Sequence, residues 1–101
     1  MKRRDVVFSP EARDDLLNLY DWIASRAGPA VAISYIERVE TFCQGFDLAS
    51  ERGQLRGDIR PGLRIVGFER RIAIAFSVSQ EQVTILRLFY GGRDWEELLH
   101  E

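Results

Sequence analysis

The stretch of residues 59–90, IRPGLRIVGFERRIAIAFSVSQEQVTILRLFY, decides the fold. It contains three runs rich in apolar, β-branched and aromatic residues, at 63–68, 72–78 and 83–90, with only short polar connections between them. Such runs predict three strands of an antiparallel meander. We therefore expect a sheet that an amphipathic element covers mainly on one side, because the central run alternates in character. One face of this run carries Ile72, Ile74, Phe76 and Val78, and the other face carries Arg71, Ala73, Ala75 and Ser77.

The third run is apolar on both faces. Such a strand is expected in the middle of a sheet, or where a tail folds over the second face. The tail 94–99, DWEELL, is expected to do this as a short helix capped by Asp94. Strict alternation divides the third run into two sets, Leu86 and Leu88 on one face, and Val83, Ile85, Arg87 and Phe89 on the other.

Two predicted helices before the sheet supply its cover. Ser9 and Pro10 are typical of a helix start, as N-cap and first helical residue, and Gly28 ends this helix. Pro29 opens a second helix directly, which predicts an antiparallel hairpin. The β-rich run 4–8 is expected as a strand at one edge of the sheet. Apolar residues recur at spacings of three and four in both helices: Ala12, Leu16, Leu19, Tyr20, Ile23 and Ala27, then Ala32, Tyr35, Ile36, Val39, Phe42, Cys43 and Phe46.

Turn-forming residues mark the connections. The segment 45–57, marked by Gly45, Ser50, Gly53 and Gly57, is expected to be the main loop. Arg60-Pro61-Gly62 is expected to be a tight turn in which Gly62 can adopt a positive φ. Glu69-Arg70 is a candidate two-residue hairpin tip, and 79–82 a longer one.

Composition limits the class of protein. With 101 residues, 46% of them hydrophobic and 30% charged, the chain is expected to form one globular domain, 1–101. No apolar run approaches the roughly 20 residues that cross a bilayer, and no signal peptide is evident, so we expect no membrane association and a cytoplasmic location. The net charge of −2 argues against direct binding to nucleic acid. One His and one Cys offer no metal site, no cofactor motif is present, and Cys43 is expected to be a buried hydrophobe.

Leu17 and Trp22 lie off the centre of the apolar stripe of the first helix. They either reach a wide core or form an exposed apolar patch that a partner covers.

Arginines gather in and after the loop, where residues 52–71 hold six of them against two acidic residues. Facing a concave sheet surface, such arginines could bind a scissile phosphate while a tyrosine transfers a proton. The alternatives are a solvated sheet face or a docking site for an acidic partner segment. We favour these two because no lysine or histidine lies among the residues concerned, Arg64, Arg70, Arg71, Arg87, Arg93 and Tyr90.

The order of several short motifs resembles the ParE-type toxins of the RelE/ParE toxin–antitoxin superfamily. The most specific pieces are RPGLR at 60–64, followed by ILR at 85–87 and GGRD at 91–94. The earlier pieces are FSPEA at 8–12, Leu16, Tyr20, Ile23-Ala24, Gly28-Pro29, Tyr35, Arg38, Arg52-Gly53 and Asp58-Ile59.

The resemblance implies an α+β domain of β-α-α-β-β-β order, in which an N-terminal helical hairpin packs on a small, mainly antiparallel sheet. It also implies a non-enzymatic toxin that inhibits DNA gyrase and that a ParD-like antitoxin neutralises in a hetero-oligomer. One alternative is a RelE-type ribonuclease that cuts messenger RNA on the ribosome, with Arg64 and Arg87 as phosphate clamps and Tyr90 as proton donor. Another is a degenerate, non-toxic remnant that only binds the antitoxin.

We expect two sets of binding residues on this basis. An amphipathic antitoxin helix would lie across the hairpin, and an acidic extended segment would follow the sheet, so the antitoxin would contact Leu17, Trp22, Arg64, Arg70 and Arg71. The toxin's target would contact Arg60, Arg87, Arg93 and Asp94.

Overall fold

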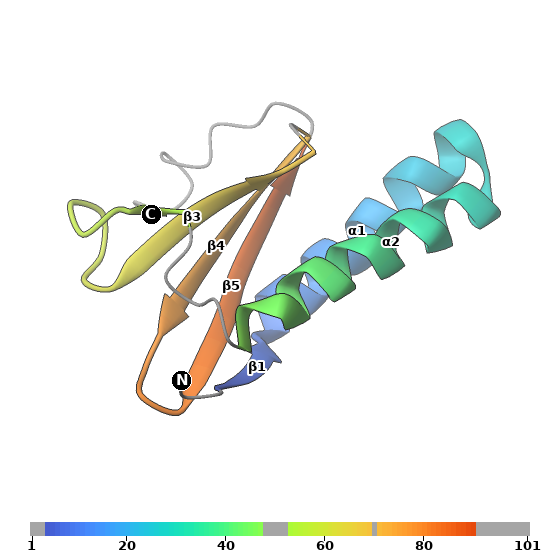
Figure 1. Cartoon of the computed structure of the whole chain (residues 1–101). Helices are drawn as coiled ribbons and strands as arrows, with labels where there is room; N and C mark the ends of the chain where they lie inside the picture. The colour runs from blue at the N-terminus through green and yellow to red at the C-terminus, as the bar shows by residue number, and fades with distance from the viewer. Residues whose placement is uncertain (1–3, 48–52, 70, 91–101) are drawn as a thin grey trace.

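The computed structural model describes residues 4–47, 53–69 and 71–90 and has the expected α+β architecture, a helical hairpin packed on a mixed sheet (Figure 1). The short helix predicted at 94–99 lies outside the described residues. In chain order the elements are β1 (Asp5–Phe8), α1 (Pro10–Ala27), α2 (Pro29–Gln44), a 3₁₀ turn (Gly45–Asp47), β2 (Gln54–Leu55), β3 (Leu63–Phe68), β4 (Ile72–Val78) and β5 (Gln82–Tyr90).

The sheet has the strand order β1-β5-β4-β3-β2. The three predicted strands form the antiparallel meander, and β1 lies at one edge of the sheet, as expected. It runs parallel to β5. The fifth strand, β2, was not predicted, because it contains two exposed residues and carries no periodic signal. Gly53 permits its approach to β3, since φ there is +78° and a Cβ would collide with the backbone oxygen of Ile65.

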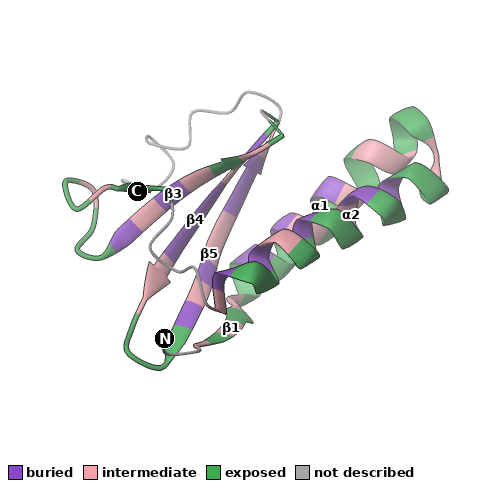
Figure 2. Cartoon of the chain, in the orientation of Figure 1, coloured by how far each residue is buried: buried purple, intermediate pink, exposed green. Residues whose placement is uncertain are grey.

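The main core lies between the helices and one face of the sheet. Most of the predicted stripe of each helix faces it, and Leu19, Val39 and Cys43 are almost completely buried. Two positions of the predicted α1 stripe are exceptions: Tyr20 is half-buried outside this core, and Ala27 is exposed. The Phe46 and Phe76 rings meet there with their centroids 4.7 Å apart. Full burial of each large apolar side chain contributes about 1.5–3 kcal/mol. Figure 2 shows this burial along the faces where hairpin and sheet meet.

A β-bulge changes which face the second half of β5 presents. Phe76 pairs with Ile85 but Ala75 pairs with Arg87, so Leu86 is an extra residue in β5. The predicted grouping of Leu86 with Leu88 is therefore wrong, because strict alternation cannot anticipate an inserted residue. Leu88 joins Val83 and Ile85 in the main core, while Leu86 and Phe89 pack with Leu63, Ile65, Ala73 and Ala75 on the second face.

The turn predicted at Gly62 is confirmed, and the hairpin tip predicted at Glu69-Arg70 is not. The Leu63 backbone N–H donates to the oxygen of Arg60, and φ of Gly62 is +78°, which gives the predicted turn. At the β3–β4 hairpin the last pair is Phe68 with Ile72, so positions 69–71 form a three-residue connection rather than the predicted two-residue tip. Glu69 adopts φ 53° there.

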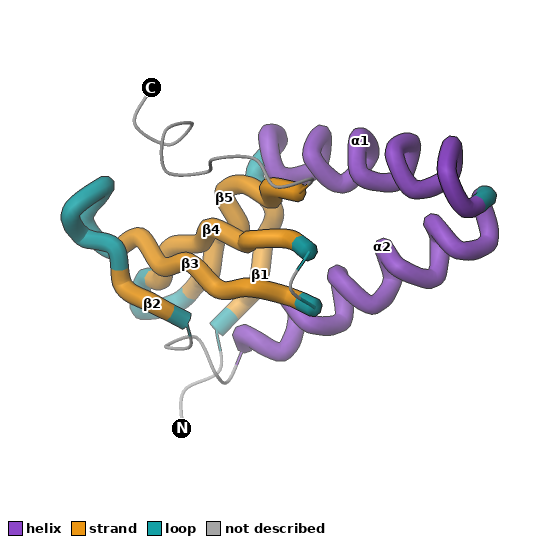
Figure 3. Tube along the Cα trace, turned by 90° about the horizontal axis from the view of Figure 1, so that it is seen from above, coloured by secondary structure: helices purple, strands orange, loops and turns teal. Residues whose placement is uncertain are grey.

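The helical hairpin lies against the sheet only along part of its length. Figures 1 and 3 show α1 and α2 side by side, with the Gly28 end of the hairpin projecting away from the strands. The two elements thus form a wedge that is closed near β1 and open toward the end of β5. Within the described ranges, neither helix is long and apolar enough to cross a bilayer.

Cys43 has the buried position that its place in the α2 stripe predicts. Its exposed fraction is 0%, and burial, with a smaller contribution from the charge of Glu40, raises the pKa of the thiol from 9.0 to about 12. Because the thiolate is the reactive species, the native protein at pH 9 should resist alkylation by iodoacetamide. The same protein unfolded in guanidinium chloride should react rapidly, as mass spectrometry would record. Equal rates in the two states would contradict this account of the α2 packing.

Candidate functional site

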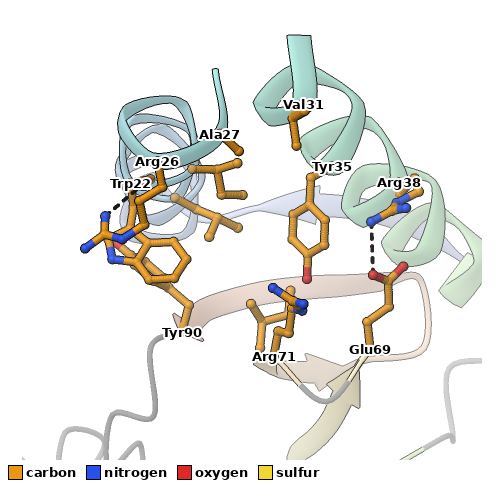
Figure 4. A pocket seen from close by; sticks show the side chains of 12 residues that line it. Trp22, Arg26, Ala27, Val31, Tyr35, Arg38, Glu69, Arg71 and Tyr90 are labelled. Carbon is orange, nitrogen blue, oxygen red and sulfur yellow. Dashed lines mark hydrogen bonds and ion pairs between the residues drawn. The ribbon is translucent and has the colours of Figure 1, made fainter. Parts of the chain in front are cut away.

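The open end of the wedge is a groove of about 560 Å³ (Figure 4). Three parts of the chain line it: the second half of α1, the first half of α2, and the end of the sheet formed by the β3–β4 connection and β5. The lining residues used below are Trp22, Arg26, Val31, Tyr35, Arg38, Glu69, Arg71 and Tyr90.

One side of the groove is aromatic and apolar. The Trp22 ring lies against Tyr90, with centroids 5.6 Å apart, and the guanidinium of Arg26 stacks over Trp22 at 4.3 Å. Trp22 keeps 37% of its surface exposed and Val31 keeps 52%. Apolar side chains that remain this exposed within one groove are typical of a surface that a partner covers.

Tyr35 brings a buried polar group to the groove. The residue is 8% exposed, and its hydroxyl has no hydrogen-bond partner in the described part of the chain. Burial, and after it the charge of Glu69, raises the pKa of this phenol, so it stays protonated and able to donate. A buried hydroxyl without a partner costs about 1–3 kcal/mol.

Charged side chains form the opposite rim. Arg38 donates to Glu69 at 3.0 Å, and the two side chains keep 54% and 38% of their surface exposed, so this pair contributes at most about 1 kcal/mol. Arg71 is exposed and has no ion pair with another described residue. The rim therefore offers one engaged arginine and one unengaged arginine to a ligand.

Comparison with known proteins decides the family. The model of the ParE toxin of the type II toxin–antitoxin system parDE matches residues 6–95. The chain belongs to the ParE toxin family. The resemblance found in the sequence is thus confirmed, and the protein is a ParE-type toxin of a type II toxin–antitoxin system. No curated protein sequence matches the chain.

Two solved structures share the ParE-type fold. The chromosomal ParDE system from P. aeruginosa aligns with a TM-score of 0.76 at 22% identity, covering 87% of this chain and 96% of that one. The toxin–antitoxin complex RelBE2 from Mycobacterium tuberculosis aligns with a TM-score of 0.58 at 18% identity, covering 92% and 97%. At these identities the likeness concerns the fold alone.

The three residues of the ribonuclease alternative do not converge in this ParE-type toxin. Arg64 pairs in register with Phe76, a residue of the main core, whereas Arg87 pairs with Ala75, which belongs to the second face. The register therefore directs the two arginines to opposite faces of the sheet. Tyr90 packs against Trp22 in the groove instead.

Arg87 is held by α1. Its Nε and Nη2 donate to the two carboxylate oxygens of Asp15 at 2.8 and 3.2 Å, and the Leu88 backbone N–H donates to the same carboxylate at 2.9 Å. These bonds to Asp15 raise the pKa of Arg87 above its ordinary value. The geometry gives Arg87 a structural role in joining α1 to β5.

The other predicted binding residues are dispersed. Trp22 and Arg71 meet in the groove, while Leu17 is 65% exposed on α1, outside the groove lining. The wide-core alternative is thus wrong for Leu17, and Trp22 combines partial packing with exposure. Arg60 is exposed in its turn, and Arg64 is half-buried on β3. Arg70, Arg93 and Asp94 lie outside the described residues.

Sequence reasoning did not select Tyr35, Arg38 or Glu69 as site residues. Tyr35 belongs to the apolar stripe of α2. The spacing of this stripe predicts that the ring packs in the core, but it does not predict the position of the hydroxyl. Trp22, just off the stripe of α1, was the signal that located this part of the surface.

The Asp15 cluster generates a stability prediction. Asp15→Asn should lower the free energy of unfolding by about 2 kcal/mol. A neutral amide cannot form the ion pair with Arg87, and it has one acceptor oxygen where the carboxylate has two. The adjacent Asp14 is exposed, so Asp14→Asn should change it by less than about 0.5 kcal/mol. Urea denaturation of both variants would measure the difference. Similar values for the two would show that the Asp15 contacts do not join α1 to β5 energetically.

Proposed function

We propose that this ParE-type toxin is held inactive by a ParD-like antitoxin bound in the groove, and that the released toxin inhibits DNA gyrase in the cytoplasm. The observation that carries the antitoxin part is the groove itself, in which exposed Trp22 and Val31 lie beside a rim containing Arg71. An amphipathic helix with acidic flanking residues fits such a surface.

The antitoxin helix would place its apolar side chains over Trp22 and Val31, and its flank would reach Leu17 on the outer side of α1. One structural relative is from a chromosomal ParDE system and the other is the toxin–antitoxin complex RelBE2, which supports a hetero-oligomer. Arg64, with Arg70, remains a proposed contact for an extended acidic segment that follows the sheet away from the groove.

Inhibition by binding, without catalysis, is the activity that we propose. Arg64 and Arg87 are directed to opposite faces, and Asp15 engages the guanidinium of Arg87. Phosphate transfer to water or to a ribose hydroxyl requires such groups to converge on one phosphate. In the proposed gyrase-binding set, Arg60 is exposed and lies outside the strands. We propose Arg93 and Asp94 as the further contacts with gyrase.

Antitoxin binding is tested with the protein encoded by the open reading frame beside the toxin gene. The two should copurify, and charge reversal by Arg71→Glu should weaken binding at low salt about tenfold or more, because each such contact to a carboxylate is charge-assisted. Arg64→Glu should weaken it as well. Arg13→Glu, an equal charge change at an exposed position on α1 outside the groove lining, is the matched control for calorimetry. Unchanged affinity of both Arg71→Glu and Arg64→Glu for the antitoxin would refute the proposed contacts.

The target is tested by inducing the isolated toxin in cells. We expect DNA breaks that depend on gyrase, with messenger RNA intact on translating ribosomes. Discrete cuts in messenger RNA, mapped by primer extension, would favour the RelE-type alternative. Unimpaired growth with a stably produced, folded chain would instead indicate a remnant that only binds the antitoxin.

A further inference from the structure

The Tyr35 hydroxyl is directed into the groove. Tyr35 stands on α2, and Figure 4 shows its ring extending toward the end of the sheet, with the hydroxyl beside Arg71. Its aromatic ring is fixed by an edge contact with Phe68, at a centroid distance of 6.0 Å, and by the Arg38 guanidinium at 5.0 Å. The hydroxyl is therefore held in one place, buried, and without a partner among the described residues.

Among the described residues, Arg71 is a cation that lies beside this hydroxyl without an ion pair. The neighbouring carboxylate, Glu69, accepts from Arg38 at 3.0 Å. Arg71 is exposed and pairs with no described residue. The described residues of the groove lining include three arginines and one glutamate, and this balance favours an anionic group.

We propose that the Tyr35 hydroxyl and the Arg71 guanidinium form a subsite for one carboxylate side chain of the bound antitoxin, next to an apolar side chain seated against Trp22 and Val31. This inference rests on the proposed function, because the antitoxin is the occupant. A carboxylate accepts hydrogen bonds only, and the two groups here both donate. A tyrosine phenol carries its proton at neutral pH, so the Tyr35 hydroxyl is able to donate.

Such a subsite provides discrimination that the apolar part of the groove lacks. Any amphipathic helix can cover Trp22 and Val31, since apolar contacts are not directional. A ligand that places an apolar or amide side chain against Tyr35 and Arg71 leaves a buried donor or a charge poorly paired. The position of one acidic residue relative to an apolar one would thus separate the cognate antitoxin from related ones.

The test removes one oxygen atom from the toxin. Tyr35→Phe should weaken binding of the antitoxin encoded by the adjacent open reading frame about tenfold or more, as expected for a lost bond to a charged group. It should leave urea denaturation of the free toxin unchanged or shift it to higher urea. Tyr20→Phe, at a half-buried tyrosine of α1 outside the groove lining, is the matched control and should leave affinity unchanged.

A double-mutant cycle identifies the carboxylate. Each Asp and Glu of the antitoxin is changed to Asn or Gln and measured against Tyr35→Phe and Arg71→Gln. For one acidic residue of the antitoxin, the change to Asn or Gln should weaken binding to the wild-type toxin but have little further effect on binding to Tyr35→Phe or Arg71→Gln. Full affinity of Tyr35→Phe, or a cycle in which no acidic residue couples to Tyr35, would overturn the subsite while leaving antitoxin binding intact.

A small probe separates this inference from the proposed function. 4-Phenylbutyrate and its neutral amide, titrated into the free toxin and followed by NMR, should differ: the acid should shift the Arg71 Nε–H and Trp22 indole signals at lower concentration than the amide does. Tyr35→Phe should remove the preference. If no antitoxin complex forms, the proposed function fails, and an acid preference would still support the subsite. Absence of that preference in the wild-type toxin would overturn it.

Discussion

The structure depends on the attachment of the start of α1 to β5. Ser9 donates its backbone N–H to Ile85 at 2.9 Å and its hydroxyl to Leu86 at 2.8 Å, and the same hydroxyl caps the helix by accepting from Ala12. Six residues later Asp15 accepts the Leu88 N–H and the Arg87 guanidinium. Strand β1 ends at Phe8, while β4 pairs with the other edge of β5 as far as Tyr90. Ser9 and Asp15 therefore continue the hydrogen bonding of β5 along the edge that β1 no longer covers.

This attachment explains why a groove exists. It fixes α1 to the sheet along the first half of the helix, and the bulge at Leu86 changes the course of β5 at the same place. The Gly28 end of the hairpin, where α1 packs on α2, then extends past the end of the strands (Figures 1 and 3). Trp22, Val31 and Tyr90 are left in the groove without a full apolar cover. The binding surface is thus a consequence of the same contacts that establish the fold.

The sequence predicted most of the fold because its signals are local. Ser9-Pro10, Gly28-Pro29 and the turn at Gly62 have conformational preferences that neighbouring residues do not override. The bulge and β2 escaped prediction because they arise from pairing between distant strands. The same limit applied to the site. Counting arginines could not show that Asp15 engages Arg87, that Glu69 engages Arg38 and that Arg71 has no such partner among the described residues. The partners are brought together by the fold.

Tyr35 shows how stability and recognition are connected in this toxin. A phenylalanine would fill the same space without leaving a buried donor unpaired, a cost of about 1–3 kcal/mol, so packing alone does not account for the hydroxyl. The Tyr35 ring packs in the core against Phe68, whereas its hydroxyl forms no hydrogen bond with the described residues of the free chain. An unpaired buried donor destabilises the free protein, and a ligand that accepts its hydrogen bond removes this cost. Such a donor therefore increases the free-energy difference between the free and the bound toxin. The strength of binding would then depend on one well-placed acceptor more than on the area of apolar surface that the partner covers.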